Sequence, residues 1–360
     1  MSLSERLSQR LQKAWYSPSG KDWLSIALLD LSWMYGAAVK IRRKLYSSGV
    51  MNSTRLPVPV IVVGNVIAGG AGKTPIVIEV AKLLAQQGYQ PGIVSRGYGR
   101  KATGVLEVLA DTHVLESGDE PALIKSAQRA PVFVASERVE AVQALLAAYP
   151  ETHVIVCDDG LQHLALQRDI EICVFDERGV GNGRLLPAGP LREAWPRAVS
   201  KPDEAWPRAA SNSGEAWPRE VDFVLHRGGF ESGFTIERQL ADHALQADGS
   251  RIDLKDLADK NLIALAGIAQ PEAFFSMLRE RGVPLTETIA LPDHYDFNSK
   301  LRIFNKGQWL ICTEKDAVKL WQMPLAQQCH IIAVPLLVSL PEAFTRALLE
   351  KLSSLQSTRS

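Results

Sequence analysis

A glycine-rich segment at residues 64–75 constrains the fold of this chain more than any other feature. It follows an apolar run at 58–63 that predicts a buried strand, and it precedes a helical pattern at 76–87. Glycines let successive backbone N–H groups close around an anion, and the start of the following helix adds partial positive charge. Here Lys73 would reach the terminal phosphates of a nucleotide, and the Thr74 hydroxyl would hold Mg²⁺. The segment therefore predicts a phosphate-binding loop for ATP or GTP.

The spacing of this loop departs from the usual Gly-x4-Gly-Lys-Thr pattern, because Ile67 stands where the first glycine would fall. Its Gly-Gly-x-Gly-Lys-Thr core is also similar to that of the partition-type ATPases, but Ala68 takes the place of their additional lysine. A glycine-rich turn with an unrelated lysine is the alternative. That alternative leaves the flanking strand and helix unexplained.

Composition places the chain among ordinary globular proteins. The 360 residues are enough for two domains with a sizeable core. Lys and Arg number 40 and so do Asp and Glu, so no basic excess indicates nucleic acid. The four cysteines stand far apart in mostly apolar runs, which favours reduced core thiols over a zinc site or disulfides. The first 13 residues are polar and of mixed charge, unlike a signal peptide.

The apolar segment at 23–39 predicts an amphipathic helix. It contains Asp30 and is shorter than the roughly 20 residues that a membrane-spanning helix needs. A basic cluster follows at 42–44, so the helix could lie in a membrane interface beside anionic head groups. A core helix docked on the following domain is the open alternative. The small and polar stripe of the helix comprises Asp22, Ser25, Ser32, Gly36, Lys40 and Arg43.

Strand and helix patterns alternate from residue 57 onward, which predicts an α/β protein whose sheet is mostly parallel and P-loop NTPase-like. Strand patterns at 221–225 and 234–240 suggest a short β connector to a second, smaller α/β domain. We expect a membrane-associating helical segment at 1–50, a kinase domain at 51–225, a β linker at 226–245 and the smaller domain at 246–360.

An 11-residue repeat interrupts the first domain. The sequence Glu-Ala-Trp-Pro-Arg begins at residues 193, 204 and 215. Its prolines break strands and helices, and its copies are too few and too short for a solenoid. We expect an insertion loop at 193–219, with a tryptophan-bearing binding arm as the less favoured interpretation.

Several polar residues stand where phosphoryl-transfer chemistry needs them. An apolar strand at 153–157 ends in Asp158 and Asp159, the place where P-loop proteins carry a carboxylate for Mg²⁺. Asp119 precedes a helix and is either an N-cap or a general base. Arg192 could neutralise charge on a transferred phosphoryl group, whereas His294, beside two acids, could relay protons or be structural.

Together these segments resemble one family, the tetraacyldisaccharide 4′-kinases of lipid A synthesis. The resemblance covers nearly the whole chain and includes the loop at 64–75, and the repeat departs from it. Six further motifs stand in the family's order: Ser-Arg-Gly-Tyr-Gly-Arg at 95–100, Ser-Gly-Asp-Glu-Pro at 117–121, Cys-Asp-Asp-Gly-Leu-Gln-His at 157–163, Leu-Pro-Ala-Gly-Pro-Leu-Arg-Glu at 186–193, Asp-His-Tyr at 293–295 and Thr-Glu-Lys-Asp-Ala at 313–317.

The resemblance implies transfer of the ATP γ-phosphate to the 4′-hydroxyl of a tetraacyl glucosamine disaccharide 1-phosphate. It implies work at the cytoplasmic face of the bacterial inner membrane, on a membrane lipid. Asp119 would be the base, paired with His294 from the other domain, and Lys73 and Arg192 would act on the phosphates. The implied nucleotide-binding residues are Gly69, Gly70, Ala71, Gly72, Lys73, Thr74 and Pro75. The implied Mg²⁺ site and its surroundings comprise Thr74, Asp158, Asp159, Glu120 and Glu193.

A second class of function remains open from the residues. A membrane-associated P-loop ATPase switch would act through a protein partner, and the sequence identifies no such partner. Ala68 counts against this class, because its members carry a lysine there.

Overall fold

The computed structural model describes residues 3–17, 22–195, 221–228, 230, 233–297 and 304–359. The chain forms two units, which we describe separately. Unit 1 comprises residues 1–73, 154–236 and 340–360, and unit 2 comprises 74–153 and 237–339. These units cut across the ranges 1–50, 51–225, 226–245 and 246–360, which stay a prediction. Of the predicted insertion loop, residues 196–219 lie outside the described ranges.

Parallel strands form the centre of unit 1. Their order is β5 (Val154–Asp158), β1 (Val60–Gly64), β6 (Ile170–Phe175), β7 (Phe223–His226) and β8 (Phe234–Thr235). Every residue of β1 and β5 is buried, so these strands are continuous apolar runs, as expected for strands covered on both faces. The strand predicted at 221–225 is therefore the next strand of this sheet.

The register of β1 decides where the polar residues of unit 1 lie. Val63 of β1 pairs with Asp158 of β5, and Gly64 pairs with Cys173 of β6. Because the strands are parallel, the glycine-rich loop after β1 and the carboxylates after β5 leave the sheet at the same edge. Gly64 has no space for a side chain there, since a Cβ would lie 2.6 Å from Cγ of Leu161.

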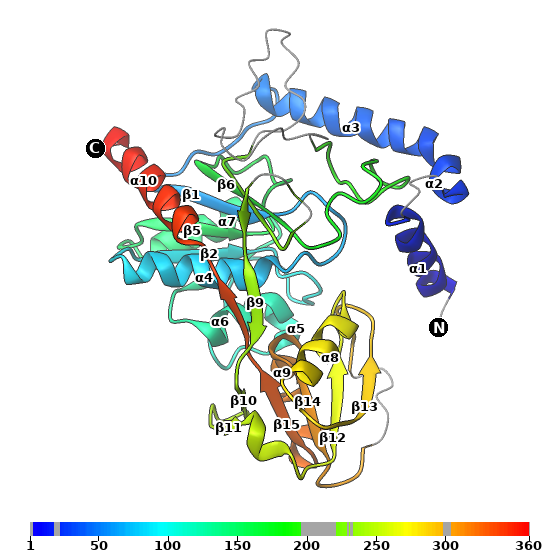
Figure 1. The fold of residues 1–360 in the computed structure, drawn as a ribbon. Coiled ribbons are helices and arrows are strands. Elements are labelled where there is room, and N and C mark those ends of the chain that lie inside the picture. The colour runs from blue at the N-terminus through cyan, green and yellow to red at the C-terminus, as the bar shows by residue number, and fades with distance from the viewer. Residues whose placement is uncertain are drawn as a thin grey trace. The chain divides into compact units, whose positions relative to one another are not determined.

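Unit 2 contains two groups of strands (Figure 1). In the first, β2 (Pro91–Ser95) pairs in parallel with β4 (Val132–Val134), and β3 (Leu106–Glu107) closes the edge antiparallel to β4. The helices of this part are α4 (Lys73–Gln86), α5 (Val114–Ser117), α6 (Asp119–Ala127) and α7 (Arg138–Ala148).

The second group of strands is a sheet with the order β11-β10-β15-β14-β12-β13. Strands β12 (Leu262–Ala266), β13 (Leu285–Ala290), β14 (Trp309–Thr313) and β15 (His330–Val334) run parallel, and β10 (His243–Leu245) and β11 (Arg251–Asp253) form the antiparallel edge. The strand predicted at 234–240 divides into β8 and β9 (Glu237–Leu240), and β9 pairs with β16 (Leu336–Ser339).

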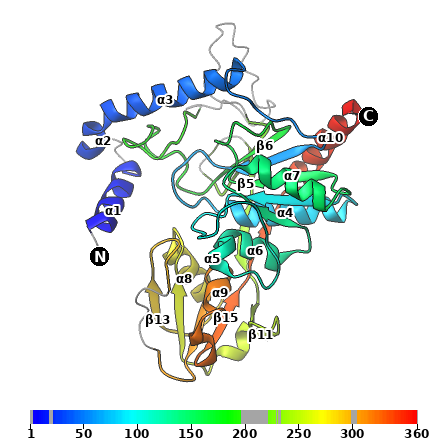
Figure 2. The same ribbon diagram turned by 180° about the vertical axis from the view of Figure 1, so that it is seen from behind.

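Alternation along β12 explains how two helices cover this sheet. Leu262, Ala264 and Ala266 pack with Phe275 of α8 (Pro271–Glu280), whereas Ile263 and Leu265 pack on the side of α9 (Glu314–Leu320). Successive side chains of a strand point to opposite faces, so α8 and α9 lie on opposite faces of the sheet. Figure 2 shows both helices against these strands from behind.

The N-terminal segment of unit 1 forms α1 (Leu3–Trp15), α2 (Trp23–Ala27) and α3 (Leu29–Ser47) rather than one helix from residue 23. Its small and polar stripe faces the protein: the Ser25 hydroxyl donates to the carbonyl of Ala188, and the Ser32 hydroxyl donates to that of Leu185 at 2.8 Å. The apolar remainder points outward, with Trp33 71% exposed. None of the helices in the described ranges has the length and hydropathy that a bilayer crossing requires.

The closing helix α10 (Glu342–Arg359) belongs to unit 1. Phe344 anchors it and is fully buried. Its ring lies 5.3 Å from that of Phe223 and 5.5 Å from that of Phe234, measured between ring centroids. The end of the chain therefore returns to the edge of the sheet in unit 1.

We expect Phe344→Ala to lower the free energy of unfolding of the full chain by about 3–5 kcal/mol, because it leaves a cavity between two rings. Urea denaturation followed by tryptophan fluorescence would measure the loss. Leu337→Ala is the matched control, since Leu337 is 45% exposed on β16. Equal losses in the two variants would contradict the anchoring role of Phe344.

Candidate functional site

The glycine-rich loop of unit 1 is held by its own neighbours. Gly69 and Gly72 have φ angles of 98° and 69°, which favour glycine. The buried Asn65 amide donates to the carbonyl of Gly69 at 3.3 Å, and the Arg178 guanidinium donates to the carbonyl of Gly70 at 2.8 Å. These bonds engage carbonyl groups of the loop, which leaves the loop shaped to present N–H groups to an anion.

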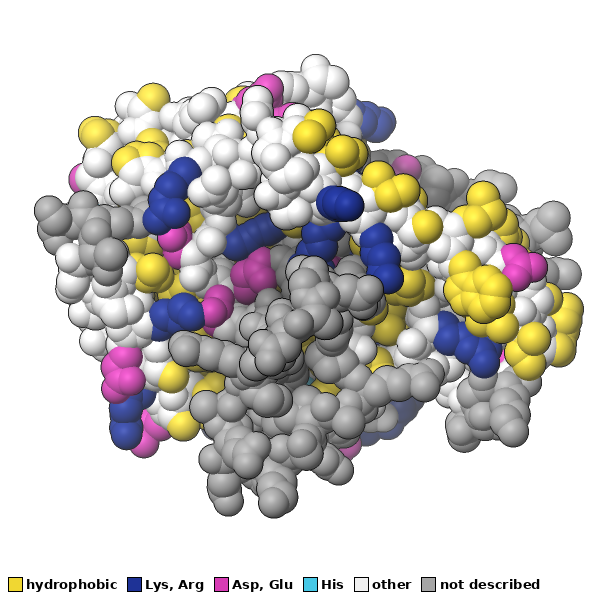
Figure 3. Space-filling model, turned by 90° about the horizontal axis from the view of Figure 1, so that it is seen from above, with side chains coloured by type: hydrophobic (Ala, Val, Ile, Leu, Met, Phe, Trp, Pro, Cys, Tyr) yellow, Lys and Arg dark blue, Asp and Glu magenta, His cyan; other side chains and the backbone are white. Residues whose placement is uncertain are grey.

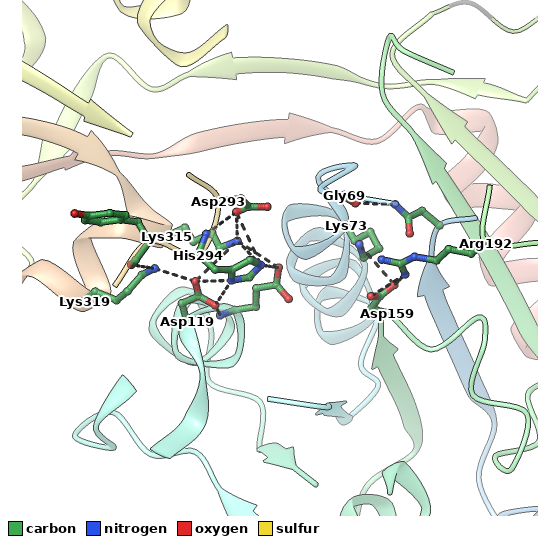
Figure 4. A network of polar contacts seen from close by, with 12 residues as sticks. Gly69, Lys73, Asp119, Asp159, Arg192, Asp293, His294, Lys315 and Lys319 are labelled. Atoms are coloured by element: carbon green, nitrogen blue, oxygen red, sulfur yellow. Dashed lines mark hydrogen bonds and ion pairs between the residues drawn. The ribbon is translucent and has the colours of Figure 1, made fainter. Parts of the chain in front are cut away.

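Three charged side chains meet beside this loop (Figure 4). Asp159 Oδ1 lies 3.6 Å from Lys73 Nζ, and Asp159 Oδ2 lies 3.3 Å from Arg192 Nη1. Lys73 is buried at the start of α4, so its cation is directed rather than free in solvent. Two cations held by one carboxylate are donors with a fixed direction, which suits a phosphate group.

The segment predicted at 186–193 lies directly against the loop. The Ala68 N–H donates to the carbonyl of Pro190, and the Arg192 N–H donates to the carbonyl of Val66, both at 2.7 Å. These backbone hydrogen bonds hold Arg192 beside the loop, although the two segments are more than a hundred residues apart in the sequence.

Gln162 joins the same region, and we assigned it no role from the sequence. Its amide donates to the carbonyl of Asn65 at 3.0 Å and to Glu193 Oε1 at 2.8 Å. The signal was available, because Gln162 lies inside the motif at 157–163 that also contains the paired carboxylates.

The residues predicted for Mg²⁺ offer the oxygen ligands that this ion prefers. Asp158 ends β5 and is fully buried, Asp159 follows it, and Glu193 is buried and oriented by Gln162. Thr74 follows Lys73 in the first turn of α4. Within the described ranges no three His, Cys, Asp or Glu side chains gather as a ready metal site. Mg²⁺ usually keeps waters and phosphate ligands, so this set fits the ion without such a cluster.

A second cluster lies in unit 2 around Asp119, the first residue of α6. Asp119 is 5% exposed, and its two carboxylate oxygens lie 3.2 and 3.0 Å from Nδ1 of His294. Gly118, with φ of 91°, turns the chain into the helix. The two residues are far apart in sequence, and both belong to unit 2.

Two lysines of α9 complete this cluster (Figure 4). Lys319 Nζ lies 3.1 Å from Asp119 Oδ2, and Lys315 Nζ lies 3.0 Å from Asp293 Oδ1 and 3.3 Å from His294 Nε2. Glu120, predicted near the metal, lies 3.5 Å from Lys315. From the sequence we left Lys315 without a role and did not consider Lys319. Their spacing of four residues, which places them on one face of a helix, was the available signal.

The charges of this cluster shift its pKa values. Burial alone would raise the pKa of Asp119, but the hydrogen bond from His294 and the charges of Lys315 and Lys319 hold it well below its usual range. Burial lowers the pKa of His294, and so does the positive charge of Lys315. The hydrogen bond to Asp119 and the negative charge of Asp119 outweigh both effects, so the pKa of His294 is raised. The cluster therefore favours an ionised carboxylate beside an imidazole that gains a proton readily.

One residue in each cluster, the one at the glycine-rich loop and the one around Asp119, has a left-handed backbone conformation. Asp159 and His294 are the non-glycine residues with positive φ in the described ranges, at 47° and 57°. Left-handed backbone is uncommon for such residues and concentrates at functional sites. Each of these residues carries a side chain that the surrounding charges hold in place.

A cavity of about 290 Å³ opens beside the Asp119–His294 pair. Its walls combine apolar and aromatic side chains with charged groups, the usual composition of a small-molecule pocket. The lining includes Tyr98, Lys101, His113, Val114, Leu115, Asp119, His294, Tyr295, Phe297, Lys319 and Met323.

The parallel sheet of unit 1, with a glycine-rich loop between β1 and α4, defines an α/β protein of the P-loop NTPase-like class. The chain belongs to the tetraacyldisaccharide-1-P 4′-kinase family, whose sequence model matches residues 24–353. The family resemblance and the fold class expected from the sequence are thus confirmed.

Relatives and a solved structure support this membership. The chain is 54% identical to a tetraacyldisaccharide 4′-kinase of Polaromonas sp. strain JS666 over 91% of this chain and 92% of that one. It is 41% identical to the enzyme of Shewanella baltica over 86% of each. Its fold is similar to that of LpxK from Aquifex aeolicus in complex with ATP, with a TM-score of 0.72 and 27% identity over 91% of this chain and 99% of that one.

We expect the stabilising effect of His294 to depend on pH. Because the pKa of His294 is raised in the folded chain, its contribution is fully present below the unfolded value of about 6.5 and is lost as pH rises through the folded value. His294→Gln should therefore lose most stability relative to wild type near pH 6 and least at high pH. Urea denaturation from pH 5.5 to 9 would measure the difference. A deficit that grows with pH would contradict this assignment.

Proposed function

We propose that this chain transfers the γ-phosphate of ATP to the 4′-hydroxyl of a tetraacyldisaccharide 1-phosphate, as its family membership indicates. The observation that carries the proposal is the buried Asp119–His294 pair on the wall of a cavity, in a chain that also has a phosphate-binding loop. An ionised carboxylate that faces a cavity is what a hydroxyl acceptor requires.

On the phosphate side, Lys73 and Arg192 would bind the transferred group. Both cations contact Asp159, so they are already aimed when the nucleotide arrives. Phosphoryl transfer depends mainly on positioning and on neutralising charge, which two directed cations provide. Thr74, Asp158, Asp159 and Glu193 would hold Mg²⁺, which supplies further charge neutralisation on the phosphates when it is bound.

On the acceptor side, Asp119 would accept the hydroxyl proton while His294 orients the carboxylate. A carboxylate with so low a pKa is a weak base. In a loose phosphoryl-transfer transition state the nucleophile's proton is lost late, so a weak but well-aimed base is sufficient. Nδ1 of His294 lies 3.0 Å from the carboxylate, within the reach of a hydrogen bond that holds it in place.

The N-terminal helices would place the enzyme on its lipid substrate at the cytoplasmic face of the bacterial inner membrane. Trp23, Leu31, Trp33, Met34 and Ile41 are all more than half exposed. Figure 3 shows hydrophobic side chains gathered with Lys and Arg side chains on this face. Aromatic and apolar side chains beside basic residues are typical of a surface that enters a membrane interface.

We expect Asp119→Ala to lower kcat by roughly 10²–10⁴ while ATP binding stays nearly intact. The measurement uses purified protein in detergent micelles with Mg·ATP and tetraacyldisaccharide 1-phosphate, and mass spectrometry detects one added phosphate. Lys73→Ala, which should lose phosphate binding, is the companion variant.

Two outcomes would contradict this assignment. Turnover near that of wild type in Asp119→Ala would reduce Asp119 to a helix cap. ATP hydrolysis without phosphorylated lipid in the wild-type protein would instead favour the ATPase switch, whose output is a partner interaction.

We also expect the double variant Trp33→Ser, Met34→Ser to bind vesicles of anionic phospholipid at least tenfold more weakly than wild type, because it removes two large apolar groups from the exposed face. Vesicle sedimentation would measure binding. Leu337→Ser, an exposed apolar position of unit 2, is the matched control. Unchanged binding in the double variant would show that α3 does not contact the lipid.

A further inference from the structure

Two lysines on α9 contact different ends of the Asp119–His294 pair. Lys315 and Lys319 stand one turn apart, and both side chains are largely buried. Lys319 contacts the carboxylate end of the pair, whereas Lys315 contacts the imidazole end. A buried cation is costly unless it is paired, so two of them at one site indicate a requirement beyond stability.

Lys319 acts on the orientation of the carboxylate. Its Nζ lies 3.1 Å from Asp119 Oδ2 and donates to the carbonyl of Tyr295 at 3.3 Å, with the ring of Phe297 5.4 Å away. These contacts leave the ammonium little freedom. On the other oxygen, the N–H of Glu120 donates to Asp119 Oδ1 at 2.9 Å. The carboxylate plane is therefore fixed from both sides.

Lys315 acts on the protonation of the imidazole. An ammonium group can only donate hydrogen bonds, so its contact with His294 Nε2 at 3.3 Å requires that nitrogen to accept. The proton of a neutral His294 then lies on Nδ1, which faces Asp119 at 3.0 Å. Lys315 is itself held by Asp293 at 3.0 Å.

Given the proposed function, we propose that Lys319 and Lys315 are positioning residues for phosphoryl transfer: Lys319 holds the Asp119 carboxylate in one orientation, and Lys315 selects the Nδ1–H tautomer of His294. Neither lysine needs to touch the reacting atoms. Together they would deliver a carboxylate ready to accept a proton and an imidazole already oriented toward it. The charged and titratable groups that face the pair are Glu120 on its own helix, Tyr98 and Asp293 from loops, and Lys315 and Lys319 from α9.

The first test is the split between kcat and the KM for ATP in Lys319→Met, with Lys319→Arg beside it. Loss of the ammonium that contacts Asp119 Oδ2 should misplace the carboxylate and lower kcat about tenfold or more. The KM for ATP should stay unchanged, and Lys319→Arg, which keeps the charge, should recover most of the wild-type kcat. Lys255→Met is the matched control, since Lys255 is exposed on the surface of unit 2.

A kcat for Lys319→Met that matches wild type would overturn the role of Lys319. A loss of kcat accompanied by an equally large rise in the KM for ATP would also overturn it, because a general structural defect has that signature. If the methionine variant does not fold, Lys319→Arg decides the role of Lys319: a loss of kcat of about tenfold or more despite the retained charge would contradict the proposal.

The second test does not depend on activity. Two-dimensional ¹H–¹⁵N spectra of the imidazole groups, with His294→Gln to assign the signal, should show His294 protonated on Nδ1 in the neutral form. In Lys315→Met the same group should hold its second proton to higher pH, because a neighbouring cation is gone. An Nε2–H tautomer in wild type would overturn the proposal. If wild type formed no phosphorylated lipid, the proposed function would fail, while these spectra would still decide the tautomer.

Discussion

Parallel pairing of β1 with β5 and β6 is the constraint on which the arrangement around the glycine-rich loop depends. The register Val63 to Asp158 brings the end of one apolar strand beside the end of another, so the glycine-rich loop and two carboxylates leave the sheet together. The chain then adds Arg192 from a third segment through backbone hydrogen bonds to the loop. Each strand is buried on both faces, which gives the edge a rigid support. Charged side chains can therefore be aimed with little freedom.

The cluster around Asp119 differs from the region of the glycine-rich loop, because its charged groups are buried together. Asp119 carries a full charge while almost wholly out of water, and it does so only because His294, Lys315 and Lys319 surround it. A buried ion pair is weak evidence for stability, and removal of one partner leaves an uncompensated charge. Such a network is better explained by the need for one defined arrangement of protons. The positive φ of His294 points the same way, since strained backbone persists where the surroundings require it.

The N-terminal helices reverse the usual relation between polarity and burial. Ser25 and Ser32 are buried because their hydroxyls donate to backbone carbonyls of unit 1, while Trp33 and Met34 face outward. The two alternatives from the sequence, a docked helix and an interfacial helix, are thus compatible: one stripe docks and the other stays exposed. A group of exposed apolar side chains is costly in water, and such a surface is typical of proteins that act on lipids or membranes.

The sequence by itself determined the α/β class, the phosphate loop and most strands, because buried parallel strands are short apolar runs and glycine, lysine and threonine at close spacing have few other uses. It also indicated Asp119, Asp159, Arg192 and His294 as candidates, since each lies in a motif beside a strand or helix end. The family resemblance also implied that Asp119 pairs with His294. Only the tertiary structure decided the geometry of that pair and the contribution of Lys319. The contact of Lys319 with Asp119 depends on packing between α6 and α9, segments nearly two hundred residues apart, and no local pattern encodes that approach. The packing of α10 in unit 1 is likewise a tertiary decision, because an amphipathic helix specifies a buried face but not the partner that buries it.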